Sequence, residues 1–542
     1  MKLSLAASVL FAATTLAQVD PIVIKGSKFF YKTNGTQFFM RGVAYQQGVE
    51  AGGATGSDSD YTDPLADTTA CKRDIEYLKK LRTNTIRVYA IDPKKDHKEC
   101  MEALQDAGIY VVADLSEPKT SINRDDPEWN TPLFERYTSV IDEMALYSNT
   151  LGFFAGNEVS NQKNNTFASA FVKAAVRDSK SYIKSKGYRQ IGVGYATNDD
   201  ADIRENLANF FDCGDRSDAI DFWGYNIYSW CGNSSFKESG FDVRTKEFAK
   251  YNVPVFFAEY GCNTMREENP PKDRLFTEVG TLYGDEMNDV WSGGIVYMYN
   301  EEANKFGLVE IKNGKVEPNG DFDNLSKEIA KATPTGVKMN EYSPTNTAAA
   351  KCPSVNSDWG AASDPLPPVV NAQACSCMMD TIACDVDASV SSDKEVGSLF
   401  GVVCGMDEGK YCAGINRNHT VGPYGAYGMC TPKEQLAFAL NAYYKSQNKA
   451  KDACDFKGSA TLKQAAATAA ASCGTLLQQA GEDGTGTLSG GAAAAETGAK
   501  SGSGSPGAAA GGLTVSHVSV GYFGIGAYLI GAVASGAAMI LL

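Results

Sequence analysis

Apolar runs of strand length alternate with helix-period segments between residues 38 and 333. The runs are rich in Val, Ile and Phe, which is typical of strands buried in a parallel sheet. The eight candidate strands are residues 38–46, 85–91, 109–116, 152–158, 190–197, 219–228, 253–261 and 293–300. Helices are expected at residues 71–82, 97–108, 132–148, 167–187, 276–290 and 324–332. Strands and helices alternating in this way over about 300 residues predict an α/β fold, a (β/α)8 TIM barrel.

A doubly wound, dinucleotide-binding sheet is the structural alternative to the barrel. Such a sheet needs a glycine-rich phosphate turn directly after its first strand. Residues 42–53, GVAYQQGVEAGG, do not supply the GxGxxG spacing at that place. The pattern therefore favours the barrel.

Two glutamates lie where apolar runs end. Glu158 closes the run at residues 151–158, and Glu259 lies near the end of the run at 253–261. The carboxyl ends of the strands share one face of a barrel, so we expect both carboxyls in one cleft. Such a pair, about 5 Å apart, breaks and remakes glycosidic bonds with retention, one acting as nucleophile and the other as acid/base. The alternative is two unrelated surface charges, but an unpaired carboxylate directly after buried residues is costly.

Neighbouring residues fit sugar chemistry at the same face. Asn157 precedes Glu158, and an amide there can hold the hydroxyl next to the anomeric carbon. We expect Glu158 to carry a proton while Glu259 stays ionised. Aromatic side chains that can pack on sugar faces gather at these strand ends, namely Tyr89, Tyr225, Tyr228, Trp230, Tyr297 and Tyr299. Core packing is the preferred interpretation for Trp223 and Tyr299.

Other classes of function are poorly supported. The three histidines, His97, His419 and His517, are scattered over different regions, so no Ser-His or HExxH site can be assembled. The sequence contains no P-loop. A net charge of −15 argues against a nucleic-acid partner, because nucleic acid requires basic patches.

Both ends of the 542-residue chain have the character of processing signals. Residues 1–17 combine a lysine with a short apolar stretch, the pattern of a secretory signal peptide. Residues 477–512 are rich in Gly, Ala and Ser, which predicts a flexible linker with a GPI attachment site between 501 and 511. The apolar tail at 513–542 resembles a GPI signal that is removed, and a tail-anchored membrane helix is the alternative.

Fourteen cysteines in a secreted chain indicate disulfides, because the secretory route is oxidising. Six are spread along the barrel and connector: Cys71, Cys100, Cys213, Cys231, Cys262 and Cys352. Eight crowd together and indicate a second, small module: Cys375, Cys377, Cys384, Cys404, Cys412, Cys430, Cys454 and Cys473. Zinc at Cys375 and Cys377 is the alternative, but no second close Cys pair or nearby His completes a tetrahedral site, so no metal is expected.

The chain thus divides into a catalytic barrel at residues 18–335, a Pro-, Asn- and Ser-rich connector at 336–371 and a Cys-rich module at 372–476. Periodicity at residues 434–447 and 462–473 predicts that the module is mainly helical. Glycosylation sequons fit a surface protein and lie at Asn34, Asn164, Asn233, Asn324 and Asn418.

Several strand-end motifs are similar to those of a known enzyme family: FFMRGVAYQ, RVYAID, AGNE, YATND, GYNIYSWCG, FFAEYGCN and WSGGIVYMY. Over residues 20–350 the chain resembles the fungal cell-wall β-1,3-glucanosyltransferases of glycoside hydrolase family 72. The eight crowded cysteines and YGAYGMC resemble a family 43 carbohydrate-binding module. The resemblance implies a GPI-anchored, cofactor-free monomer at the outer face of the plasma membrane or in the wall. Its activity would be to cleave internal β-1,3-glucan linkages and transfer the new reducing end to the nonreducing end of another glucan.

The resemblance also implies residue roles. Glu158 falls on the family's acid/base and Glu259 on its nucleophile. Substrate contacts fall on Tyr89, Asp114, Ser116, Lys119, Asn123, Arg124, Asn157, Asp199, Arg204, Tyr228 and Tyr297. The implied disulfides join Cys71 to Cys100, Cys231 to Cys262 and Cys213 to Cys352, while the pairing of the other eight cysteines stays open. A hydrolytic endo-β-1,3-glucanase and a non-catalytic glucan-binding surface protein are the alternatives.

Overall fold

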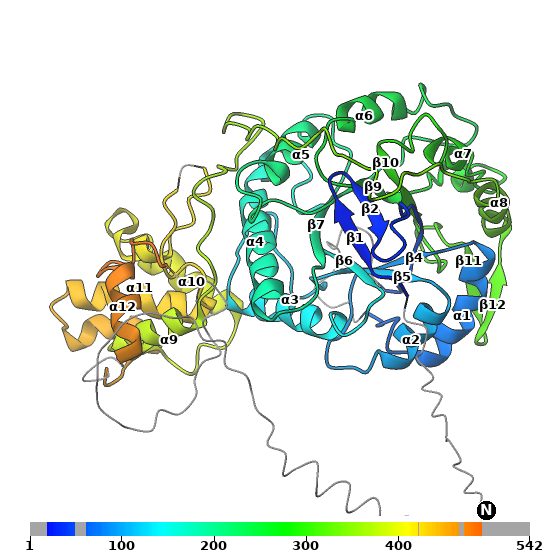
Figure 1. Cartoon of the computed structure of the whole chain (residues 1–542). Coiled ribbons are helices and arrows are strands. Elements are labelled where there is room, and N and C mark those ends of the chain that lie inside the picture. The colour runs from blue at the N-terminus through cyan, green and yellow to red at the C-terminus, as the bar shows by residue number, and fades with distance from the viewer. Residues whose placement is uncertain (1–18, 49–60, 421, 466–470, 490–542) are drawn as a thin grey trace, which may run out of the picture. The chain divides into compact units, whose positions relative to one another are not determined.

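Eight parallel strands close into a barrel in the order β10-β3-β4-β5-β6-β7-β8-β9 (Figure 1). The computed structural model describes residues 19–48, 61–420, 422–465 and 471–489. The barrel strands are β3 (Met40–Ala44), β4 (Thr85–Val88), β5 (Tyr110–Asp114), β6 (Thr150–Asn157), β7 (Gly192–Thr197), β8 (Trp223–Asn226), β9 (Val255–Tyr260) and β10 (Trp291–Val296). Each overlaps one of the predicted strands, so the predicted TIM barrel is confirmed.

Helices surround the barrel strands (Figure 1). They are α1 (Thr68–Lys80), α2 (Lys98–Asp106), α3 (Thr131–Met144), α4 (Ser169–Ser185), α5 (Arg204–Asp212), α6 (Phe241–Phe248), α7 (Glu278–Leu282) and α8 (Gly320–Ile329). Asn130 caps α3 with its side-chain oxygen, and Pro132 lies in the first turn. Helix α7 is much shorter than the helix predicted at residues 276–290, because Gly280 and Gly284 lower helix propensity there.

A hairpin near the N-terminus fills the amino end of the barrel. Phe29 on this hairpin packs against Phe222 and Phe256, with ring centroids 6.1 Å apart in both pairs. Gly194 makes room for the Phe222 ring, which a Cβ at that position would strike. The hairpins outside the barrel pair β1 (Ile22–Lys25) with β2 (Lys28–Tyr31) and β11 (Val309–Lys312) with β12 (Lys315–Pro318). They were not predicted, because four-residue strands carry too little periodicity.

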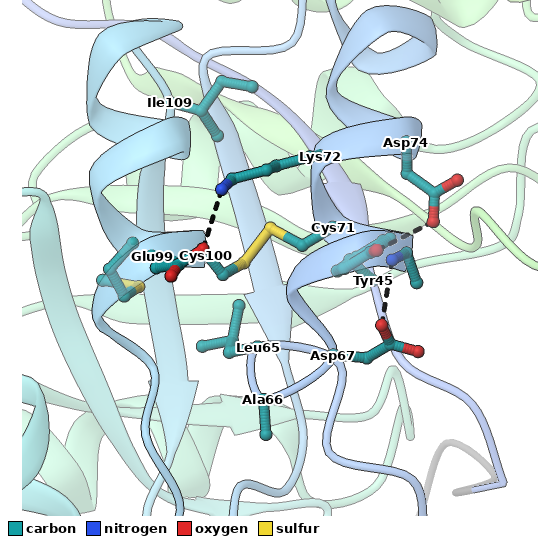
Figure 2. The surroundings of a disulfide bond; sticks show 12 residues. Tyr45, Leu65, Ala66, Asp67, Cys71, Lys72, Asp74, Glu99, Cys100 and Ile109 are labelled. Atoms are coloured by element: carbon teal, nitrogen blue, oxygen red, sulfur yellow. Dashed lines mark hydrogen bonds and ion pairs between the residues drawn. A yellow bond between two sulfur atoms is a disulfide. The ribbon is translucent and has the colours of Figure 1, made fainter.

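A disulfide between Cys71 and Cys100 joins helices α1 and α2 on the outside of the barrel (Figure 2). Beside it, the hydroxyl of Tyr45 donates to Asp74 of α1 at 2.8 Å. These two links fix α1 to the next helix and to the segment that follows β3. The other disulfides of this half of the chain join Cys231 to Cys262 and Cys213 to Cys352, which are the pairings that the resemblance implied.

The Cys-rich segment folds into a small, mainly helical module. Its elements are α9 (Ala372–Thr381), β13 (Cys384–Val386), α10 (Asp393–Val403), α11 (Pro432–Ser446), β14 (Ala460–Leu462) and α12 (Gly474–Ala480). Its disulfides join Cys375 to Cys430, Cys377 to Cys473, Cys384 to Cys454 and Cys404 to Cys412. Short 3-10 helices are η1 (Lys163–Ala168), η2 (Thr264–Glu267), η3 (Asp407–Ile415), η4 (Lys451–Cys454), η5 (Phe456–Gly458) and η6 (Ala471–Cys473).

Two expectations about the module change. The helix predicted at residues 462–473 is wrong at its start, because Leu462 ends β14 and pairs with Cys384 of β13. The zinc alternative also fails at its named cysteines. Cys375 lies close to Cys430 and Glu434 in an arrangement that could suit a metal, but the two sulfurs are bonded to each other and offer no thiolate.

Side chains of the module contact the barrel. Phe167 lies nearly parallel to His419 with ring centroids 4.3 Å apart, and Phe171 of α4 meets Tyr424 edge-on at 6.0 Å. Arg417 donates to Glu128 in the loop between β5 and α3 at 2.6 Å. Aromatic packing therefore continues from the barrel helices into the module.

Among the described residues, no helix has the length and apolar character needed to cross a bilayer. The expected signal peptide at residues 1–17 and the expected GPI tail at 513–542 lie outside the described residues, as does the linker beyond residue 489.

Removal of the module should destabilise the barrel. A chain that ends at residue 371 exposes the aromatic faces of Phe167 and Phe171 to water. We expect its melting temperature to fall by at least about 5 °C and its binding of an apolar dye to increase. A truncated barrel that melts at the same temperature as the full chain, measured by circular dichroism, would show that this packing adds no stability.

Candidate active site

Glu158 and Glu259 lie at the carboxyl ends of barrel strands, on either side of one asparagine. Asn226 at the end of β8 is the ladder partner of Glu259 on β9. The side-chain nitrogen Nδ2 of Asn226 donates to Oε1 of Glu158 at 2.7 Å. Asn226 thus lies beside Glu259 across the β8–β9 ladder and donates its side-chain amide to Glu158. The structure brings the two predicted acids to the same end of the barrel.

Glu259 is buried and held by three donors. Its side chain is only 1% exposed. Tyr89 donates its hydroxyl to Oε1 at 2.8 Å, and Tyr228 donates its hydroxyl to Oε2 at 2.7 Å. Arg87 adds a longer contact from Nη1 to Oε1 at 3.3 Å. Donors on both oxygens fix the orientation of the carboxylate and stabilise its charge.

Arg87 is itself buried and paired. Its Nε and Nη2 donate to the two oxygens of Asp114 at 3.0 and 2.9 Å, a bidentate pair. The guanidinium also lies 4.3 Å from the ring centre of Tyr89 and 4.5 Å from that of Phe154. Asp114 was predicted to contact substrate, but its carboxylate is buried and both of its oxygens are engaged by Arg87. Its place in the structure is to support Arg87.

The pKa of Glu259 is raised to about 7, chiefly by burial. The positive charge of Arg87 lowers this pKa, the negative charge of Glu158 raises it, and the hydrogen bonds from Tyr228 and Tyr89 lower it. Loss of solvation makes the charged form of Glu259 costly, and the donors offset part of that cost, so the expected ionised state depends on those donors. A carboxylate held in this way is poorly solvated, which suits a nucleophile.

Glu158 occupies a different environment. It is half-buried and has a φ of 50°, in the left-handed region that non-glycine residues rarely adopt. Its backbone N–H donates to the carbonyl of Ala196 at 2.9 Å, and its carbonyl accepts from Arg124 at 2.9 Å. Such strain persists only where the surroundings impose it, and it is concentrated at functional sites. A partly exposed carboxyl can exchange protons with groups that enter and leave.

Other predicted contacts fall into groups. Tyr297 is buried with its ring centre 6.3 Å from that of Tyr89, the tyrosine whose hydroxyl donates to Glu259. Asp199 accepts from Arg204 at 2.7 Å and from the hydroxyl of Tyr225, which forms a second polar cluster at the end of β7. The aromatic residue Tyr225 therefore belongs to this cluster.

The residues of the loop at 116–124, which were predicted to contact substrate, differ in their exposure and in their contacts with the site. Arg124 reaches the backbone of Glu158. Asn123 is exposed, and its side-chain oxygen accepts the N–H of Asp125 within a turn. Lys119 is exposed and Ser116 is half-buried in the same loop.

Trp223 and two aromatic residues of the predicted cluster, Trp230 and Tyr299, lie in the core. Trp223 and Tyr299 are fully buried, which confirms the preferred interpretation for them. Trp230 is 5% exposed and donates its indole N–H to Thr277 at 2.9 Å. The disulfide between Cys231 and Cys262 fastens the segments that follow Tyr228 and Glu259 to each other.

Two site residues were missed from the sequence. Arg87 is a charged residue inside the buried strand TIRV, and this placement is a signal that could have been read. Asn226 ends the apolar run of β8 as Glu158 ends that of β6. Polar residues at the carboxyl ends of barrel strands are candidates for function.

Comparison with known proteins assigns the family. A family model described as Glucanosyltransferase matches residues 11–333, and one described as X8 domain matches residues 382–461. The chain belongs to the glucanosyltransferases of glycoside hydrolase family 72. This family member is 55% identical over 503 residues to a 1,3-β-glucanosyltransferase of Arthroderma benhamiae. The match covers 90% of this chain and 90% of the relative.

Further relatives agree along most of their length. The Schizosaccharomyces pombe 1,3-β-glucanosyltransferase gas1 is 46% identical over 474 residues, covering 87% of this chain and 84% of the relative. The solved structure of Saccharomyces cerevisiae Gas2p in complex with laminaripentaose matches with a TM-score of 0.75 and 43% identity. The match covers 83% of this chain and 99% of the solved chain.

Loss of the Tyr228 hydroxyl should shift the pH dependence of this family member. The hydrogen bond from Tyr228 lowers the pKa of Glu259, so Tyr228→Phe raises that pKa. The acidic limb of the profile of kcat/KM against pH should move to higher pH by about one pH unit. Tyr45→Phe is the matched control, because it removes a buried hydroxyl that donates to Asp74. An unmoved limb in Tyr228→Phe, or an equal shift in both variants, would contradict the assignment.

Proposed function

We propose that this protein is a 1,3-β-glucanosyltransferase that elongates cell-wall β-1,3-glucan by a retaining mechanism. The observation that carries the proposal is the placement of Glu158 and Glu259 on either side of Asn226 at the carboxyl end of the barrel. Membership of the family and the relatives named 1,3-β-glucanosyltransferase support the reaction. The relative solved with laminaripentaose supports the substrate class.

In the first half of the proposed reaction, Glu259 attacks the anomeric carbon at an internal β-1,3 linkage. The carbon–oxygen bond of the linkage breaks while Glu158 gives its proton to the departing oxygen. A glucosyl ester on Glu259 results, and the departing chain leaves with a new nonreducing end. Tyr89 and Tyr228 hold the carboxylate oxygens in line for the attack.

In the second half, the nonreducing end of another glucan supplies a hydroxyl. Glu158, now a carboxylate, takes the proton of that hydroxyl as its oxygen attacks the anomeric carbon. A β-1,3 bond forms and the ester to Glu259 breaks, so one linkage is exchanged for another and no cofactor is required. Tyr297 and the cluster of Asp199 and Arg204 are proposed to contact the glucan chains.

We extend the proposal to the rest of the chain. The module at residues 372–476 is proposed to bind carbohydrate, and the segments at 1–17 and 513–542 to be removed as signal peptide and GPI signal. The mature protein would be a GPI-anchored monomer outside the cell. Seven disulfides that use every cysteine support export through an oxidising compartment. Exposed sequons at Asn34, Asn164 and Asn233 support glycosylation.

Product lengths from one defined laminari-oligosaccharide test the proposed reaction. Transfer gives products both shorter and longer than the starting chain, because each released fragment is matched by an elongated acceptor. Hydrolysis by an endo-glucanase gives only shorter chains. We expect longer chains to accumulate in the chromatogram at early times, and their absence would overturn the transferase proposal in favour of hydrolysis.

Two isosteric variants separate catalysis from scaffolding. Glu158→Gln and Glu259→Gln should each lose transfer activity by several orders of magnitude, because an amide can neither attack nor exchange the proton. Both should keep the circular dichroism spectrum of the parent. A variant that retains full activity would remove its carboxyl from the mechanism, and inactivity of the parent itself would favour a non-catalytic binding protein.

A further inference from the structure

Asn226 makes contacts that suggest a specific part in the reaction. Its side chain is only 2% exposed at the end of β8. The nitrogen Nδ2 donates to Oε1 of Glu158 at 2.7 Å and to Oδ1 of Asn157 at 3.1 Å. Its own oxygen Oδ1 is buried and accepts no hydrogen bond within the described part of the chain. The amide is therefore used from one side only.

The orientation of the amide follows from its neighbours. Two oxygen atoms, one from Glu158 and one from Asn157, face the same end of Asn226. Only the NH2 group can satisfy both, because the reversed amide would place three oxygens together. The reversal would also leave both acceptors without this donor.

A purely structural explanation accounts poorly for this side chain. A buried acceptor without a partner destabilises a fold, and an apolar residue of similar size would avoid that cost. The compensating contacts of Asn226 go to the carboxyl of Glu158 and to the adjacent Asn157. Asn157 and Glu158 are predicted site residues, so the unpaired buried oxygen of Asn226 lies within the candidate active site.

We propose that Asn226 is a positioning residue that decides which oxygen of Glu158 carries the catalytic proton, an inference that rests on the proposed function. An amide NH2 only donates, so a proton on Oε1 would compete with the N–H of Asn226 for the same lone-pair region. The proton is thereby assigned to Oε2. This oxygen protonates the departing glucan and later takes the proton of the incoming hydroxyl.

The same contact orients Asn157. Its Oδ1 accepts from Asn226, which turns the Nδ2 of Asn157 to the other side as a donor. An amide donor beside the acid/base can hold a sugar hydroxyl next to the anomeric carbon. Asn226 therefore fixes the acid/base and its neighbour together, and it does so without touching substrate itself.

The test compares two donors with different need for an acid. Laminari-oligosaccharides require protonation of the departing oxygen, whereas a β-laminarioligosyl fluoride releases fluoride ion without it. For Asn226→Ala we expect kcat on the oligosaccharide to fall about 10- to 100-fold with KM changed less than about threefold. The pre-steady-state burst of fluoride should stay within about threefold of the parent. A residue that only stabilised the fold would slow both donors equally.

A second variant and a pH profile strengthen the test. Asn226→Asp keeps the volume but replaces the N–H donor by a carboxylate that repels the charge of Glu158. The alkaline limb of the profile of kcat/KM against pH should move to higher pH in this variant. Asn252→Ala is the matched control. Asn252 precedes β9, donates to the carbonyl of Ala348 and touches neither glutamate. The control should show neither effect.

The outcomes are distinguishable. Equal loss on both donors, or parental behaviour of both Asn226 variants, would overturn the positioning role of Asn226. A parent enzyme that turns over neither donor would instead overturn the proposed function. If Asn226→Ala fails to fold by circular dichroism, the donor comparison is made on Asn226→Asp, with the same expected split.

Discussion

Burial of the Glu259 carboxylate is the constraint around which the carboxyl end of this barrel is organised. Taking a carboxylate out of water costs several kcal/mol unless donors replace the lost solvation. Arg87, Tyr89 and Tyr228 supply those donors. Arg87 is also buried, and it requires Asp114 in turn. Removal of Arg87 would leave both Asp114 and Glu259 buried without their cationic partner, so these three charged side chains depend on one another.

The barrel supplies these groups because its register aligns residues that are distant in sequence. Arg87 comes from β4, while Asn226 ends β8 opposite Glu259 on β9. Aromatic packing fills the opposite end, where Phe29 meets Phe222 and Phe256. One end of the barrel is therefore closed by apolar packing, and the polar residues gather at the other. The two glutamates consequently share an end but differ in burial, which gives them different chemistry.

Periodicity was sufficient to predict the eight barrel strands, because buried parallel strands read as continuous apolar runs. Both glutamates were found from their positions at the ends of such runs. Arg87 was missed because its role depends on partners from β5 and β9 that only the closed barrel brings together. Asn226 was missed for the same reason. The raised pKa of Glu259 also depends on burial by distant residues, which no local pattern reveals. The start of the helix expected at residues 462–473 was wrong because pairing of Leu462 with β13 overrides local propensity.

In the proposed mechanism, Glu259 forms a covalent bond to sugar during the reaction. A 2-deoxy-2-fluoro-β-laminarioligosyl fluoride slows breakdown of such an intermediate enough for it to be captured, and peptide mass spectrometry then locates the attached sugar. We expect one added glycosyl group on the peptide that contains Glu259, and no adduct in Glu259→Gln. An adduct on Glu158 or on any other residue, or products of inverted configuration from the parent enzyme, would contradict this mechanism.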